Sequence, residues 1–164
     1  MTATLRRLGQ LGDKTMLYEW ANSPEVVPFM YRDHVISAEE HEAWYFSARD
    51  DENKFIIELD GQAVGFVQCS CVSDKDRRWT WGHYIATESA RGCGVGKAVE
   101  FLMTDHIFNQ GAAKISIEAF ADNERVIAIH ERFGYRREAY YQRHIWKAGQ
   151  WRDVIGLAMT DDEW

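Results

Sequence analysis

The sequence lacks several features that would assign it to a broad class of protein. Its 164 residues include only two prolines and three cysteines, and no apolar run approaches the roughly 18 residues of a membrane-spanning helix. The cysteines are odd in number and lack the spacing of metal ligands, so they predict reduced thiols and no metal site. The first residues carry no apolar core of a signal peptide. Together these absences predict a cytoplasmic protein.

Basic charge is also scarce. Nineteen lysines and arginines face 26 aspartates and glutamates, which gives a net charge of −7 at pH 7. A nucleic-acid-binding face needs surplus cations to neutralise phosphates, so we expect no nucleic-acid partner. A small or partly cationic ligand suits this balance better. The sequence leaves the oligomeric state open between a monomer and a homodimer.

What the sequence does contain is enough apolar side chain for one core. Hydrophobic residues make up 46% of it, including seven Trp, seven Tyr and eight Phe. A chain of this length can bury roughly 70% of its unfolded surface, so we predict a single domain over residues 1–164.

Hydrophobic periodicity predicts alternating strands and helices. Strands are expected near residues 5–8, 55–59, 63–69, 78–86 and 115–120, and on both sides of a turn at Ala148-Gly149-Gln150. Helices are expected after Asp13 to about residue 21, at residues 38–49 and 95–109, and from Asn123 onward with a core stripe of Val126, Ile129 and Phe133. The order β-α-α-β-β-β-α-β-α-β-β predicts a mixed α/β domain.

The most informative stretch is Arg91-Gly92-Cys93-Gly94-Val95-Gly96-Lys97, which opens the third predicted helix. Glycines remove the side chains that keep a phosphate away from the backbone. Amide groups at a helix N-terminus, together with the helix dipole, bind anions. Arg91 and Lys97 add full charges. The stretch therefore predicts a loop that binds a phosphorylated cofactor.

Two common phosphate-binding motifs do not fit this loop. In a GxGxxG motif the third glycine stands three residues after the second, and the glycines at 92, 94 and 96 do not meet this spacing. The loop also follows the fourth predicted strand rather than the first. Nor is it GxxxxGK[ST], because Ala98 follows the lysine and supplies no hydroxyl for Mg²⁺.

Two motifs in order resemble the GNAT superfamily of acetyl-CoA-dependent N-acetyltransferases. The family motif [Gln/Arg]-x-x-Gly-x-[Gly/Ala] is met at every fixed position by residues 91–96. The second motif is an Asn opening a helix that ends in Glu-x-x-Gly-[Phe/Tyr], met here by residues 123–135. The resemblance implies an acyltransferase with a mostly antiparallel mixed sheet flanked by helices. It also implies acetyl-CoA as the co-substrate.

The resemblance also implies which residues bind the cofactor. The pyrophosphate of CoA would lie on the amides from Gly92 to Lys97. The pantetheine arm would pair like an added strand with the backbone of Ile85, Ala86 and Thr87. The full set is Ile85, Ala86, Thr87, Arg91, Gly92, Cys93, Gly94, Val95, Gly96 and Lys97, with Asn123 and Ile127 near the arm and the thiol end.

Acetyl transfer needs a neutral amine and a proton for the leaving thiolate. By the resemblance, His130 stands where the family usually places a tyrosine acid. The family's fourth-strand carboxylate is missing, so Glu118, acting through water, and His83 are candidate bases. Each also has a structural interpretation: His130 as a packing residue, Glu118 as a solvated carboxylate, and His83 as a half-buried, hydrogen-bonded ring.

The acceptor side resembles the acetyltransferases of pseudaminic acid biosynthesis, which act on the 4-amino group of a UDP-linked dideoxy-amino sugar. The shared elements lie in residues 22–44 and 144–155. Candidate ligands for this nucleotide sugar are Met30, Tyr31, His34, His41, Trp44 and Trp81. Related enzymes act on protein N-termini or on small-molecule amines, and a non-catalytic CoA-binding module is a further alternative.

Overall fold

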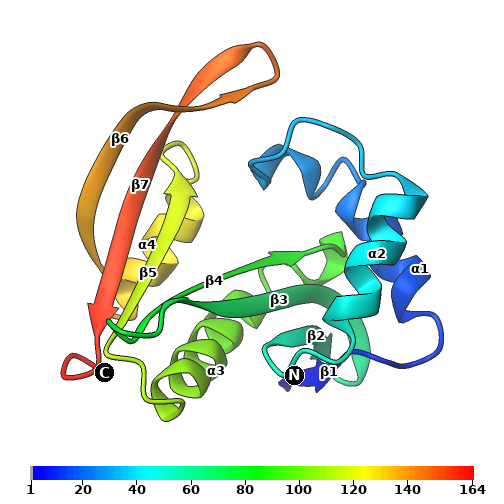
Figure 1. Ribbon diagram of the computed structural model, residues 1–164, viewed down its shortest axis with the longest axis horizontal. Coiled ribbons are helices and arrows are strands. Elements are labelled where there is room, and N and C mark those ends of the chain that lie inside the picture. The colour runs from blue at the N-terminus through cyan, green and yellow to red at the C-terminus, as the bar shows by residue number, and fades with distance from the viewer. Residues whose placement is uncertain (1) are drawn as a thin grey trace. The chain divides into compact units, whose positions relative to one another are not determined.

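The computed structural model describes residues 2–164 (Figure 1). Its strands and helices follow the order expected from the sequence, with two short 3₁₀ turns added. The elements are β1 (Ala3–Arg7), α1 (Asp13–Ala21), η1 (Val27–Phe29), α2 (Ala38–Ala48), β2 (Lys54–Leu59), β3 (Gln62–Ser73), β4 (Arg78–Ile85), η2 (Glu88–Ala90), α3 (Val95–Asn109), β5 (Lys114–Phe120), α4 (Glu124–Arg132), β6 (Arg136–Lys147) and β7 (Gln150–Thr160).

The described strands form one seven-stranded mixed sheet in the order β1-β2-β3-β4-β5-β7-β6. The pairs β1/β2, β2/β3, β5/β7 and β6/β7 are antiparallel, whereas β4 and β5 are parallel. The predicted fold class is therefore confirmed. The chain divides into two compact units, one ending at Gln68 and adding His83–Val95, the other comprising Cys69–Gly82 and Gly96–Trp164.

In the first unit, helices α1 and α2 lie side by side (Figure 1). Ser37 Oγ accepts the Glu40 N–H at 3.1 Å, so the predicted cap of α2 is confirmed. The tight turn between β2 and β3 is also confirmed, with Asp60 at φ 50° and Gly61 at φ 79°. The buried core comprises Leu8, Leu17, Ala48, Ile56 and Phe66, with Trp44 and Tyr84 among the side chains packed against it.

Asp13 connects β1 to α1 in this unit. Its carboxylate accepts two hydrogen bonds from Arg6, at 2.9 and 3.0 Å, and one each from the Gly9 and Gln10 amides. Burial raises the pKa of Asp13, but these hydrogen bonds outweigh it and lower the pKa below its usual value.

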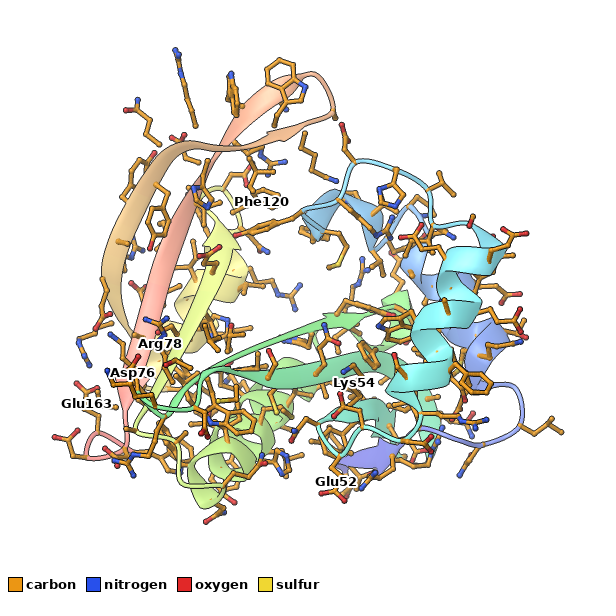
Figure 2. The ribbon with its side chains drawn as sticks, viewed as in Figure 1. Glu52, Lys54, Asp76, Arg78, Phe120 and Glu163 are labelled. Atoms are coloured by element: carbon orange, nitrogen blue, oxygen red, sulfur yellow. The ribbon has the colours of Figure 1, made fainter. Side chains whose placement is uncertain are left out.

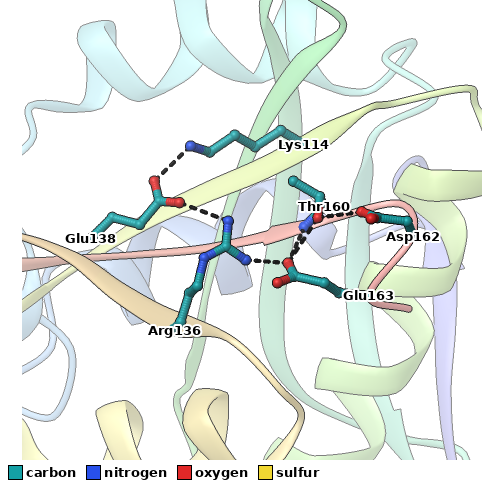
Figure 3. Close-up of polar contacts among 6 residues, drawn as sticks. All are labelled: Lys114, Arg136, Glu138, Thr160, Asp162 and Glu163. Carbon is teal, nitrogen blue, oxygen red and sulfur yellow. Dashed lines mark hydrogen bonds and ion pairs between the residues drawn. The ribbon is translucent and has the colours of Figure 1, made fainter.

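In the second unit, β6 and β7 form the long hairpin that ends in the predicted turn, with Ala148 at φ 50° and Gly149 at φ 77° (Figure 1). An exposed ion network joins the strands at the other end of the hairpin (Figure 3). There Glu138 accepts from Lys114 at 2.6 Å and from Arg136 at 2.9 Å, while Arg136 also bonds Glu163. Exposed pairs of this kind add little stability, so the network mainly fixes the strand ends.

The predicted core stripe of α4 was wrong. The buried residues of this helix are Ile127 and His130, whereas Val126, Ile129 and Phe133 remain partly exposed. The buried face of α4 is shifted by one residue along the sequence from the predicted one. Apolar spacing could not identify it because one of its two members, His130, is polar.

Phe120, labelled in Figure 2, lies at the end of β5, and a cation covers its ring. The Arg152 guanidinium lies 4.2 Å from the centre of the Phe120 ring and bonds both carboxylate oxygens of Asp122, at 2.5 and 2.7 Å. These contacts hold the segment that leads into α4. Throughout residues 2–164, no helix is long and apolar enough to cross a membrane.

Candidate functional site

The glycine loop has a left-handed backbone at two positions. Gly92 and Gly94 adopt φ angles of 84° and 83°, which side-chain-bearing residues rarely tolerate. A Cβ built at either glycine would meet nothing within 4 Å. The loop therefore needs glycine for its backbone shape, and it leaves open space beside the backbone for an incoming group.

Helix α3 begins directly after this loop, at Val95. The first four amides of a helix have no acceptor within it, and its dipole places partial positive charge there. Gly96 allows α3 to pack closely on α4. A Cβ built at Gly96 would lie 3.6 Å from Ile129 Cδ1, so a larger side chain would press on α4. The loop and the first turn of α3 together offer an anion-binding backbone.

Arg91 is partly exposed and bonds two backbone carbonyls. Its Nη2 donates to the carbonyl of Ile85 at 3.0 Å and to that of Glu25 at 3.2 Å. Arg91 thus fastens the loop to the end of β4. Lys97 is exposed and keeps its charge available, while Cys93 Sγ contacts the Ser89 carbonyl at 3.4 Å.

The segment predicted to pair with pantetheine is partly occupied by the protein itself. Ala86 and Thr87 both donate their N–H groups to the Val64 carbonyl, at 2.8 and 3.4 Å. The Thr87 hydroxyl is buried and has no hydrogen-bond partner among the described residues. A buried polar atom without a partner is costly, and a polar ligand along this segment would satisfy it.

Strands β4 and β5 pair only where they begin. Their parallel ladder joins Arg78 to Lys114 and Trp79 to Ile115. Over the part of the chain that the structure describes, the ladder contains no further pair.

The second unit contains a buried polar cluster from β4, α3, α4 and the connection that follows α4, formed by Trp81, Glu100, Thr104, His130 and Tyr135. Its central contact joins His130 Nδ1 to Glu100 Oε1 at 2.8 Å. The Tyr135 hydroxyl accepts the Trp81 indole N–H at 3.1 Å and lies 3.1 Å from Thr104 Oγ1. The His130 ring packs edge-on against Trp81 and tilted against Tyr135, with centroids 5.6 and 5.4 Å away.

The end of α4 explains why Tyr135 lies beside His130. The Gly134 amide donates to the Glu131 carbonyl at 3.0 Å, and the Tyr135 amide donates to the His130 carbonyl at 3.1 Å. With Gly134 at φ 99°, these two bonds form a Schellman motif. Burial raises the pKa of Tyr135 to about 12, although its hydrogen bonds with Thr104 and Trp81 act to lower it. Tyr135 therefore stays a neutral phenol.

Sequence reasoning missed Glu100, Thr104 and Tyr135. Glu100 is fully buried, at 0% exposure, on the apolar side of α3 between Val99 and Met103. The available signal was a carboxylate beside an apolar stripe, since a charged residue there is rarely buried without a partner.

The other two proposed proton-transfer residues lie elsewhere. Glu118 is exposed on β5, opposite Gly156 of β7. His83 is partly buried on β4, in the other compact unit. Asn123 precedes α4 and caps it through its carbonyl, which accepts from Val126 and Ile127, and its side chain makes no capping bond.

The predicted acceptor ligands separate into interior and exposed groups. His41 is buried, with Nε2 at 2.7 Å from the Lys14 carbonyl, and Trp44 packs on the core of the first unit. Trp81 is buried in the polar cluster. Tyr31 and His34 are exposed, and His34 Nε2 lies 3.1 Å from both Glu40 oxygens. Met30 and Trp44 are partly exposed, so Met30, Tyr31, His34 and part of Trp44 offer accessible surface.

The chain is similar to known proteins in sequence and in fold. It matches the acetyltransferase (GNAT) domain family over residues 3–136 and belongs to that family. It is 31% identical over 117 residues to the SPbeta prophage-derived uncharacterized N-acetyltransferase YokL of Bacillus subtilis, covering 69% of this chain and 64% of the relative. An uncharacterized N-acetyltransferase of Methanocaldococcus jannaschii is 28% identical over 102 residues, covering 58% of this chain and 45% of the relative.

The fold itself matches solved structures. A spermidine N-acetyltransferase from Vibrio cholerae, solved with CoA and spermine, superposes with a TM-score of 0.88 at 19% identity, covering 98% of this chain and 96% of that one. The chain spans less than two thirds of the length of the two curated relatives. Family and fold are thus established.

Proposed function

We propose that this chain is an acetyl-CoA-dependent N-acetyltransferase that acts on a primary amine. The observation that carries the proposal is the left-handed Gly92/Gly94 loop opening α3, in a chain that belongs to the GNAT family. Backbone amides from Gly92 to Lys97 would hold the pyrophosphate. The backbone of Ile85, Ala86 and Thr87, together with the unpartnered Thr87 hydroxyl, would hold the pantetheine arm. When bound, acetyl-CoA supplies the thioester carbonyl that the amine attacks.

Proton transfer is assigned to this chain's own side chains. We propose that His130 holds a proton and gives it up as the thiolate forms. Glu118, acting through water, is the proposed acceptor of the amine proton, with His83 as the rival. Changing His130 to Ala should lower kcat by roughly 10²-fold and leave CoA affinity nearly unchanged in calorimetric titration. An unchanged kcat would remove His130 from this role.

For the acceptor, we propose the 4-amino group of a UDP-linked dideoxy-amino sugar. The support is the sequence resemblance in residues 22–44 and the accessible surface of Met30, Tyr31 and His34. His41 is buried and Trp44 is half-buried in the same unit, so we propose that these two side chains support this surface from within, whereas Trp81 is buried in the polar cluster of the other unit.

A polyamine is the second candidate acceptor. The net charge of −7 favours a polycationic substrate over a nucleotide that itself carries negative charge. The Vibrio cholerae enzyme of the same fold was solved with spermine. A protein N-terminus is a third candidate acceptor, because enzymes that the sequence resembles act on protein N-termini.

One assay separates these possibilities. Free thiol released from acetyl-CoA is measured with a UDP-4-amino-4,6-dideoxy sugar, with spermidine and with a peptide beginning in Ala or Ser. Thiol release with the sugar alone supports the first proposal, whereas release with spermidine alone replaces it with the second. If CoA raises the melting temperature but no amine yields thiol, the chain is a non-catalytic CoA-binding module and the enzymatic proposal fails.

The proposed compartment is the cytoplasm. Within residues 2–164, none of Cys69, Cys71 and Cys93 forms a disulfide, which suits a compartment where thiols are kept reduced. Fractionation of cells expressing the chain at its native level would test this.

A further inference from the structure

We propose that Glu100 is a positioning residue that fixes the tautomer and orientation of His130, so that Nε2 is the nitrogen that holds and releases the proton. This inference rests on the proposed function of His130 as the proton donor. It concerns a residue that neither sequence motif contains, because Glu100 lies in the body of α3 and His130 in α4.

The contact itself is specific. His130 Nδ1 lies 2.8 Å from Glu100 Oε1, within the range of a charge-assisted hydrogen bond. The side chains are 8% and 0% exposed, so little water competes for this bond. A carboxylate oxygen only accepts, and therefore Nδ1 must carry the hydrogen. In the neutral ring this leaves Nε2 as the acceptor, and in the protonated ring it makes Nε2–H the second donor.

The surroundings of the ring limit it to this orientation. Trp81 lies edge-on to it at 5.6 Å and Tyr135 lies tilted at 5.4 Å. The hydroxyl of Tyr135 is already bonded to Trp81 and Thr104, and no bond from it to His130 is formed among the described residues. Glu100 is therefore the polar side chain that sets which ring nitrogen carries hydrogen. No described residue bonds Nε2, in contrast to Nδ1.

Stability alone gives a poor reason for Glu100. Its second oxygen, Oε2, is buried without a hydrogen-bond partner among the described residues. A buried carboxylate with half of its acceptor atoms unused costs free energy. An apolar side chain of similar size at such a site is often neutral or stabilising. A carboxylate retained at this cost points to a task performed on His130.

The proton balance of the proposed step is simple. The amine nitrogen forms a bond to the acetyl carbon and the thioester C–S bond breaks. The sulfur takes the electron pair of that bond, and the Nε2–H proton would pass to it. The ring becomes neutral with its remaining hydrogen on Nδ1, where Glu100 accepts it. The proton that the amine loses to the proposed base can pass to solvent, and a proton from solvent can then return to Nε2. No oxidant or further reactant is needed.

The test compares Glu100→Gln with a matched control, Glu131→Gln. Each variant removes one carboxylate charge. Glu100 contacts His130 in the fold, whereas Glu131 follows it in the sequence, is exposed and pairs with Arg137 at 2.7 Å. In the full-length protein we expect Glu100→Gln to lower kcat by roughly 10²-fold with KM for acetyl-CoA unchanged, and Glu131→Gln to match the wild type. Glu100→Asp, which keeps the carboxylate, should recover part of the lost kcat.

A second readout needs no acetyl-CoA. Nitrogen-15 NMR of histidine-labelled protein reports which ring nitrogen is protonated, with the His130 signals identified by their loss in His130→Gln. We expect hydrogen on Nδ1 in the wild type and a shift toward Nε2 in Glu100→Gln, whose amide can donate to Nδ1. Because this measurement is made without substrate, it tests the pair even if no amine proves to be accepted.

Two results would overturn the inference. One is a wild-type His130 that carries hydrogen on Nε2 and none on Nδ1. The other is a Glu100→Gln variant with a lowered melting temperature but wild-type kcat, which would make Glu100 a packing residue only. The double variant Glu100→Gln/His130→Gln should be no slower than His130→Gln alone, and a further loss would also contradict the proposal.

Discussion

Replacing Gly65 with alanine should force strand β3 away from the end of β4. A Cβ at Gly65 would lie 2.3 Å from the Tyr84 carbonyl oxygen, 3.2 Å from Ile85 Cα and 3.3 Å from Ile57 Cδ1. The first distance is far below van der Waals contact, and the atom it meets is backbone. A flexible side chain could rotate away, but here a strand must move.

The magnitude follows from this geometry. Overpacking a well-filled interior typically costs about 1–3 kcal/mol, and a clash with backbone belongs at the upper end. For a chain of this length, each kcal/mol lowers the melting temperature by about 2–4 °C. We therefore expect Gly65→Ala to lower the free energy of unfolding by about 3 kcal/mol and the melting temperature by about 6–12 °C.

The assay is calorimetric unfolding with Gly82→Ala as the matched control. Gly82 lies on β4 and its Cβ would meet nothing within 4 Å, so the same substitution there should be nearly neutral. The shift should also reach the cofactor loop, because the neighbouring Ile85 carbonyl anchors Arg91. CoA affinity should therefore fall in Gly65→Ala alone. Equal melting temperatures for the two variants would refute the reasoning.

Three further predictions concern separate parts of the chain. Gly94→Asp should abolish CoA binding in calorimetric titration, because it strains a left-handed position and places negative charge in the loop, whereas the turn variant Gly149→Asp should bind normally. Asp13 has a lowered pKa when folded, so its stabilisation exists above the unfolded value of about 3.9 and is lost as pH falls through the folded pKa. Urea unfolding of Asp13→Asn should therefore show a flatter pH dependence between pH 6 and pH 3 than the wild type, and parallel curves would contradict this. Tyr135→Phe removes a buried hydroxyl with two hydrogen bonds and should cost about 1–3 kcal/mol in denaturant unfolding, with no loss if that hydroxyl is dispensable.

Local signals in the sequence predicted local structure well. The capping box at Ser37, the turn at Asp60-Gly61 and the helix end at Gly134 each involve bonds within a few residues. The glycine loop belongs to this class too, since its shape depends on the φ angles of Gly92 and Gly94. Such features depend on backbone preferences that a residue carries wherever it stands.

Contacts between distant segments could not be predicted in the same way. The His41 ring is bonded by a carbonyl 27 residues earlier, Arg91 by one 66 residues earlier, and His130 by a carboxylate 30 residues earlier. Apolar spacing ranks helix faces by hydrophobicity, so it assigned the α4 core to Val126, Ile129 and Phe133 and left His130 at its edge. A buried polar pair reverses that ranking, and neither member reveals the pairing by itself.

The motif that ends in Gly134-Tyr135 acquires a physical reason in this chain beyond stopping a helix. Its Schellman bonds place the Tyr135 ring against His130, and the Tyr135 hydroxyl anchors that ring to Trp81 of β4. The ring of His130 is thereby packed on two sides by side chains whose own positions are fixed, while Glu100 from α3 bonds its Nδ1. A histidine held in this way loses little conformational entropy when it transfers a proton to a bound ligand. The helix end, the buried tyrosine and the buried carboxylate can therefore be understood as parts of one arrangement that orients Nε2.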